Sequence, residues 1–472
     1  MKKNSIRNKS TLLSHVHFSI RMQYLCLRSI QEFKKKYKGD YDTQPVGEAF
    51  ILDSLLELFI RSKEGILLQY SNDELNNIFN DAIGALYNSQ NFIIKKEGLL
   101  DSFGILFSLW EFEEQEDIFI KFFRYSYFYN FKNEKIDMPK LFFDSFGTNY
   151  SEYLSLALEV SLITIGADYS QFYDYLKIIE ERHPIAFEHL LLTSEEYYNY
   201  SVFVCENIED IAFSVKVSQS YPFIKHKNII YLPLPHACIT ACTKSLLYRL
   251  TFGKDNIRRD VGKETMENYV FSILNGSSIY EIVSHEVFFD EKKKILSPDV
   301  LCYKDGNLFA AECKLLTPSS RTRLLDKESL ENTKRILIED ICKLYKSLFI
   351  YYSCDGNGLP FVLKENRFGS VVLLERIDFD HRMIMKSVAD KLGLNDEERH
   401  FLSEHIRFDS LYDIERLAFC HGNAIQEMRN MINDNRVFDF SISHSTGEKE
   451  YIHKDFISFK KDVLGKIPNS MK

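Results

Sequence analysis

The sequence predicts an α+β protein in which a large helical N-terminal region, residues 1–250, precedes an α/β core at residues 251–376 built on a mixed sheet. Apolar residues recur at helical spacing through most of the first region. After Arg259 the pattern becomes helix, three strands, helix and strand. The 472 residues, 45% apolar and 14% aromatic, are enough for more than one buried core, so two or three domains are expected.

Composition excludes several classes of protein. With 38 Phe and 27 Tyr the chain is too aromatic to be disordered throughout, and its apolar runs are too short to cross a bilayer. The basic, polar N-terminus lacks a signal-peptide pattern, and the nine unpaired Cys fit reduced thiols. We therefore expect a cytoplasmic protein without a membrane partner.

The net charge of -9 does not favour nucleic-acid binding, but the charge is unevenly distributed. Residues 314–346 hold eight Lys or Arg against five acids, enough for a local basic patch. Lys334, Arg335 and Lys343 can contact phosphates there, or can form an ordinary solvated helix face.

In the N-terminal region we predict helices at 46–68, 99–131, 150–165 and 237–250. Another helix should begin at Thr193 or Ser194, because a hydroxyl followed by two glutamates suits a helix N-terminus. His236, Cys238 and Cys242 share one helix face, but no second Cys/His pair follows nearby. We therefore favour an apolar helix surface over a zinc site.

The second region predicts the order α-β-β-β-α-β. The expected elements are a helix at 262–274, strands at 279–289, 299–303 and 308–316, a helix at 327–348, and a strand at 370–375. Asp305-Gly306 joins the second and third strands as a tight hairpin. Residues 377–472 read as a mostly helical extension with a strand at 437–442; this extension either completes the core or forms a small separate unit.

Charged residues lie in the two hairpin strands at the ends away from the Asp305-Gly306 turn. Asp299 begins one strand, and Glu312 and Lys314 lie two residues apart on the next, so they share a face. Their neighbours are apolar, and charges placed in a buried strand are costly unless paired or bound to a metal. Such a local conflict is expected at a functional site.

These residue types suit hydrolysis of a phosphodiester assisted by Mg²⁺ or Mn²⁺. Asp299, Glu312 and the backbone carbonyl of Cys313 can ligate the ion, and Glu267 on the preceding helix can add a carboxylate. Lys314 can orient the attacking water or stabilise the charged phosphate.

Pro298-Asp299 followed by Glu312-Cys313-Lys314 resembles the signature of the PD-(D/E)XK, or restriction-endonuclease-like, nuclease superfamily. The resemblance covers residues 258–376 and implies the same α-β-β-β-α-β core, with Glu267 matching an acid found on the first helix of many members. Tyr345 matches a further motif of some exonuclease-like members, but Ile341 replaces the Gln that accompanies it.

The resemblance implies a metal-dependent nuclease that cuts nucleic acid, DNA rather than RNA. A nuclease of this kind joined to a helical region is similar to effectors of bacterial anti-phage defence. The helical region would then sense a trigger, form a homo-oligomer or recruit a protein partner. Three alternatives stay open. Glu312 and Lys314 can be an ordinary ion pair, the fold can have lost activity, or the chain can be a non-catalytic nucleic-acid-binding or scaffold subunit of a defence or repair complex.

Overall fold

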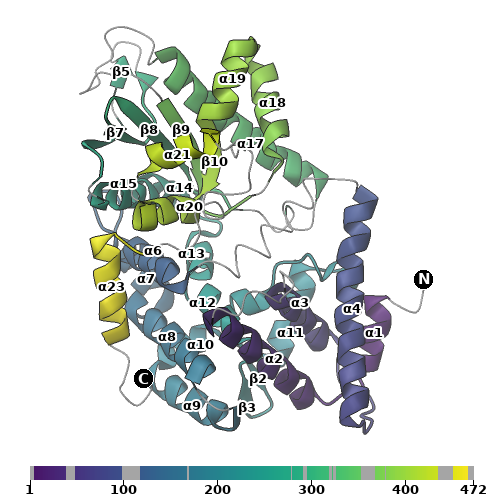
Figure 1. The fold of residues 1–472 in the computed structure, drawn as a ribbon. Helices are drawn as coiled ribbons and strands as arrows, with labels where there is room; N and C mark the ends of the chain where they lie inside the picture. Colours follow the sequence, from purple (N-terminus) through teal and green to yellow (C-terminus); the bar gives the residue numbers. More distant parts are fainter. Residues whose placement is uncertain are drawn as a thin grey trace. The chain divides into compact units, whose positions relative to one another are not determined.

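The computed structural model divides the chain into two compact units. The first comprises residues 1–130, 138–252 and 467–472, and the second comprises residues 131–137 and 253–466. The structure describes residues 5–38, 48–97, 117–166, 169–277, 279–286, 288–290, 295–317, 322, 326–351, 367–377, 379–421, 423–433 and 450–465. The predicted α+β class is confirmed, with helices and a mixed sheet (Figure 1).

The first unit is mainly helical. Its helices are α1 (Ile6–Leu13), α2 (Phe18–Lys38), α3 (Glu48–Arg61), α4 (Asn72–Glu97), α6 (Ile118–Asn130), α7 (Met138–Phe146), α8 (Tyr150–Gly166), α9 (Tyr169–Arg182), α10 (Pro184–His189), α11 (Ser194–Val204), α12 (Pro235–Ala241) and α13 (Lys244–Thr251). A small sheet, which the sequence analysis missed, contains β1 (Leu191–Thr193), β2 (Phe223–His226) and β3 (Ile229–Tyr231) in that order. None of the described helices is long and apolar enough to span a membrane.

Local chemistry explains one predicted helix start and one wrong prediction. Thr193 and Glu196 form a capping box at the start of α11, each side chain accepting a hydrogen bond from the other's backbone N–H. The single helix predicted at 237–250 is instead α12 and α13. The helix is interrupted at Thr243, whose φ and ψ are -126° and -100°. The Tyr129 hydroxyl donates a hydrogen bond to the Thr243 carbonyl at 2.6 Å. A tertiary hydrogen bond thus satisfies a carbonyl at the break.

The second unit is built around a five-stranded mixed sheet with the order β10-β9-β8-β7-β4. The strands are β4 (Ile282–His285), β7 (Val300–Lys304), β8 (Asn307–Lys314), β9 (Arg367–Leu373) and β10 (Ile406–Ser410). β4, β7 and β8 pair antiparallel, whereas β8, β9 and β10 pair parallel. β5 (Phe288–Asp290) and β6 (Ile295–Leu296) form a separate ribbon.

Helices pack against this sheet and against one another. They are α14 (Asp255–Asp260), α15 (Glu267–Gly276), α17 (Lys327–Tyr345), α18 (His381–Leu392), α19 (Asp396–His405), α20 (Leu411–Arg416), α21 (Ala424–Asn433) and α23 (Lys454–Gly465). α15 contacts β4 and β7, and the crossover helix α17 contacts β9 and β10. The elements α15, β4, β7, β8, α17 and β9 follow one another in the predicted order of helix, three strands, helix and strand, but β5 and β6 are inserted between β4 and β7.

Three predictions for this unit need correction. The strand predicted at 279–289 is divided between β4 and β5. The helix predicted at 262–274 contains a π-helical segment, Val261–Met266; a Cβ on Gly262 would lie 3.3 Å from the Cβ of Leu315, so glycine permits close contact with the chain after β8. Residues 406–410, expected to be helical, form β10. The strand predicted at 437–442 lies outside the described residues.

Candidate active site

Three carboxylates lie just past the paired residues at one end of β4, β7 and β8. The register pairs His285 with Val300, and Val300 with Ala311. Glu286, Asp299 and Glu312 each lie one residue beyond these pairs, in three neighbouring segments of the chain. Extending the register by one residue would place Glu286 opposite Asp299 and Asp299 opposite Glu312, and residues directly opposite in neighbouring strands share a face. Like charges placed this way repel each other unless a proton or cation lies between them.

Asp299 is tied to the neighbouring strand. Its Oδ2 accepts the backbone N–H of Cys313 at 2.6 Å, which fixes the carboxylate beside Glu312. Burial, followed by repulsion from Glu312, raises the pKa of Asp299 to about 7, although this hydrogen bond opposes the shift. Cys313, whose carbonyl we predicted as a metal ligand, lies between Glu312 and Lys314 in β8, and its backbone N–H bonds to Asp299. The thiol of Cys313 is buried.

Lys314 lies between two carboxylates. Its Nζ is 2.8 Å from Oε1 of Glu312 and 3.6 Å from Oδ1 of Asp340 on α17. The three side chains are 29%, 15% and 8% exposed, respectively. Burial alone would lower the pKa of Lys314, but Glu312 and Asp340 raise it above its ordinary value by more. The amine is therefore held in its charged form.

Glu267 joins the same group from the first turn of α15. Burial, followed by repulsion from Asp299, raises the pKa of Glu267 to about 8, and Glu286 and Glu312 contribute in the same direction. The helix reaches this position through the π-helical segment that contacts the end of β8. Such segments are often found at functional sites.

The donor set suits a hard divalent cation. Carboxylates and a backbone carbonyl are the ligands that Mg²⁺ prefers, and a cation would offset both the burial and the repulsion that raise the pKa values of Asp299 and Glu267. The oxygens do not converge on one point: across the described residues, no three His, Cys, Asp or Glu side chains are arranged to hold a metal ion. Side-chain rotation, with release of the Glu312–Lys314 contact, would be needed for binding.

The structure therefore brings together all four side chains that the sequence analysis selected, Asp299, Glu312, Lys314 and Glu267. It also adds two that the analysis missed. Glu286 could have been found by extending the strand register by one residue. Asp340 could have been found as a carboxylate on the apolar side of a helix, near Leu337 and Leu344 in the sequence.

The raised pKa values predict how the stability of the metal-free protein depends on pH. Native Asp299 and Glu267 retain protons up to about pH 7 and 8, whereas the unfolded carboxyls lose theirs near pH 4. Native protein thus binds more protons over this window, so its stability falls as pH rises from about 4 to 8. We expect the thermal midpoint in EDTA to fall by a few degrees, and Glu267→Gln to flatten the profile. A Glu267→Gln profile as steep as that of the wild type would contradict the assignment.

The basic residues of α17 are weaker candidates for contact with substrate phosphates. On α17, Lys334 pairs with Glu331, Arg335 with Glu339 and Lys343 with Asp340, at 3.1, 3.2 and 3.3 Å. These contacts fit a salt-bridged helix surface.

His236, Cys238 and Cys242, for which we favoured an apolar helix surface over a zinc site, do not all face one another. The Sγ atoms of Cys238 and Cys242 are 4.0 Å apart and buried, but the His236 ring faces Ser29 and Asp53 instead. Cys238 and Cys242 form no disulfide.

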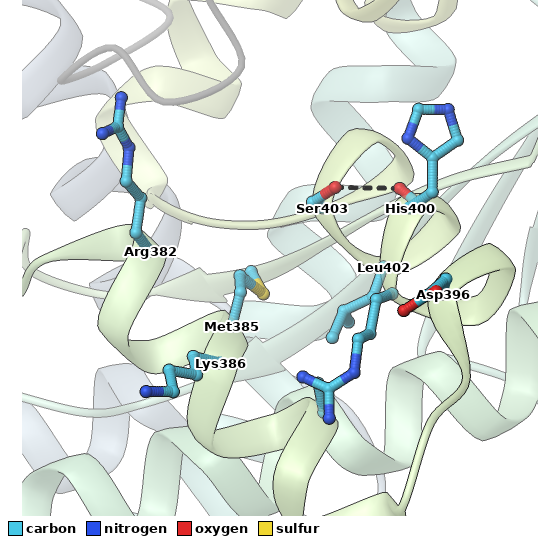
Figure 2. A pocket seen from close by; sticks show the side chains of 9 residues that line it. Arg382, Met385, Lys386, Asp396, His400, Leu402 and Ser403 are labelled. Atoms are coloured by element: carbon cyan, nitrogen blue, oxygen red, sulfur yellow. Dashed lines mark hydrogen bonds between the residues drawn. The ribbon is translucent and has the colours of Figure 1, made fainter.

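A pocket of about 360 Å³ lies between α18 and α19 (Figure 2). Its lining is partly basic and comprises Arg382, Met385, Lys386, Ala389, Asp396, Arg399, His400, Leu402 and Ser403. Arg399 is paired with Asp390 at 2.9 Å, and His400 lies 3.3 Å from Glu404, which offsets part of this charge. The pocket contains none of the carboxylates around Lys314.

Comparisons with family models, with curated proteins and with solved structures found no match to this chain.

Proposed function

We propose that this chain is a metal-dependent nuclease with a restriction-endonuclease-like core of the PD-(D/E)XK type. The observation that supports this most strongly is the gathering of Asp299, Glu312, Lys314 and Glu267 at one end of the β7–β8 pair. These are the residue types that metal-assisted phosphodiester hydrolysis needs, and they come from separate elements.

In this proposal Mg²⁺ or Mn²⁺ would be held by Asp299, Glu312, Glu267 and the Cys313 carbonyl, and it would supply Lewis acidity toward a water and a phosphate oxygen. The hydrogen bond from Cys313 N–H orients the Asp299 carboxylate. Lys314 remains protonated, so its ammonium stabilises negative charge that develops on the phosphate rather than acting as a base at neutral pH.

DNA is the substrate we favour over RNA, through the resemblance of residues 258–376 to nucleases that mostly cut DNA. A role as an effector of anti-phage defence in the cytoplasm is part of the same proposal. The helical first unit would recognise a protein partner or a second copy of the chain.

The proposal is tested with purified full-length protein and three substrates: supercoiled plasmid, linear duplex with blocked ends, and single-stranded RNA. With Mg²⁺ or Mn²⁺ we expect nicking or linearisation of the plasmid, and in EDTA no cleavage. Cleavage of the blocked duplex would indicate an endonuclease. Salt-dependent binding to plasmid without cleavage in either metal would support the non-catalytic subunit instead.

A further inference from the structure

Asp340 is a buried carboxylate on α17 with its charge directed at the end of β8. Its side chain is 8% exposed, and its Oδ1 lies 3.6 Å from the Nζ of Lys314 and 3.3 Å from that of Lys343. A charge buried to this degree is costly unless it is paired. Asp340 therefore depends on a cationic partner.

Of the two partners, Lys314 matters more. The Lys343 side chain is 67% exposed, and ion pairs made by exposed side chains are worth little because water screens them. Lys314 is far less exposed, so its attraction to Asp340 is screened less. Glu312, Lys314, Asp340 and Lys343 thus form a row of alternating charges that runs from the sheet into α17.

We propose that Asp340 is a positioning residue that holds the Lys314 ammonium in place during cleavage; this role rests on the proposed nuclease function. Glu312 cannot satisfy Lys314 at 2.8 Å and also turn both oxygens toward a cation. When Glu312 turns away, Asp340 is the near carboxylate that still holds the amine at the end of β8. Asp299 acts on the same amine at longer range.

Without this second partner, the flexible lysine side chain would sample several rotamers once Glu312 was engaged. Fixing a long side chain costs conformational entropy, and a displacement of about 1 Å at a reacting group can cost about a hundredfold in rate. Removal of the Asp340 carboxylate is therefore expected to lower turnover without lowering the affinity for substrate or metal.

The test compares Asp340→Asn with Glu339→Gln in the full-length protein. Glu339 is the neighbouring acid on α17, pairs with Arg335 and Lys391, and does not contact Lys314. We expect Asp340→Asn to lower kcat by roughly ten- to a hundredfold, with KM for duplex DNA and the Mg²⁺ concentration for half-maximal rate unchanged. Asp340→Glu should restore part of the rate, and Glu339→Gln should cleave like the wild type.

A second measurement does not use activity. Urea unfolding of Asp340→Asn, Lys314→Met and the double variant should show non-additive effects, because each single change leaves the other group without its partner. Additive effects, or an unchanged kcat in Asp340→Asn, would overturn the inference. A shifted Mg²⁺ requirement would make Asp340 a metal ligand instead. A wild-type protein that cuts nothing would refute the proposed function and this role with it, while the unfolding cycle would still report whether the two groups interact.

Discussion

Lys314→Met is expected to lower the rate of metal-dependent cleavage by about a thousandfold while the protein remains folded. Methionine keeps most of the length and apolar stem of the side chain but removes the ammonium that would face the phosphate. The loss should appear in kcat, because the lost interaction strengthens as charge develops in the transition state. Initial rates on supercoiled plasmid over a range of DNA concentrations measure it.

Asp299→Asn gives a companion result that separates the loss of activity from loss of folding. Asparagine keeps an oxygen for the Cys313 N–H but carries no charge beside Glu312. At pH 8 we expect no cleavage and a thermal midpoint above that of the wild type, because burial and repulsion from Glu312, which raise the pKa of Asp299, no longer act on a charged group. Lys391→Met, which removes an exposed amine that pairs with Glu339 and not with Asp340, serves as the control. Cleavage by Asp299→Asn at the wild-type rate would remove Asp299 from the site.

Arg407→Met is expected to destabilise the second unit by about 3–5 kcal/mol. Arg407 and Asp409 lie in β10 with their side chains 3% and 2% exposed, and Nη2 of Arg407 is 3.2 Å from Oδ1 of Asp409. Ser370 in β9 donates to the other oxygen of Asp409 at 2.7 Å. Removing the guanidinium leaves a buried carboxylate with too little compensation, and urea unfolding should show the loss.

Two variants give this result its controls. Arg335→Met breaks an ion pair with Glu339 whose side chains are 61% and 44% exposed, so we expect a loss below about 1 kcal/mol. Arg407→Met combined with Asp409→Asn should recover most of the lost stability, since no charge is then buried alone. Equal losses for the buried and the exposed pair would show that burial does not set the cost.

The candidate site was accessible from the sequence because its signals are local. Glu312 and Lys314 are two residues apart on one strand, and the turn at Asp305-Gly306 brings Asp299, one residue before β7, close to them. Strand alternation and a tight turn therefore determine their proximity without any knowledge of the rest of the fold.

The missed features depend on contacts between distant segments. Residues 406–410 were expected to belong to a mostly helical extension, yet they form a strand in which Arg407 and Asp409 satisfy each other's buried charge. The helix break at Thr243 involves a hydrogen bond from the Tyr129 hydroxyl. Asp340 can be identified as a site residue only when its contact with Lys314 is known. Local propensity carries no record of such partners.

The parallel strand β10 has a consequence for the boundaries of the nuclease-like region. Residues 406–410 bond to the outer side of β9 along its length, from Gly369 to Leu373. A fragment that stopped at residue 376 would uncover that row of backbone donors and acceptors and strip Ser370 of its bond to Asp409. Uncovered strands recruit other chains, so such a piece would tend to self-associate. The extension beyond residue 376 thus supplies the strand that pairs with β9 within the same chain.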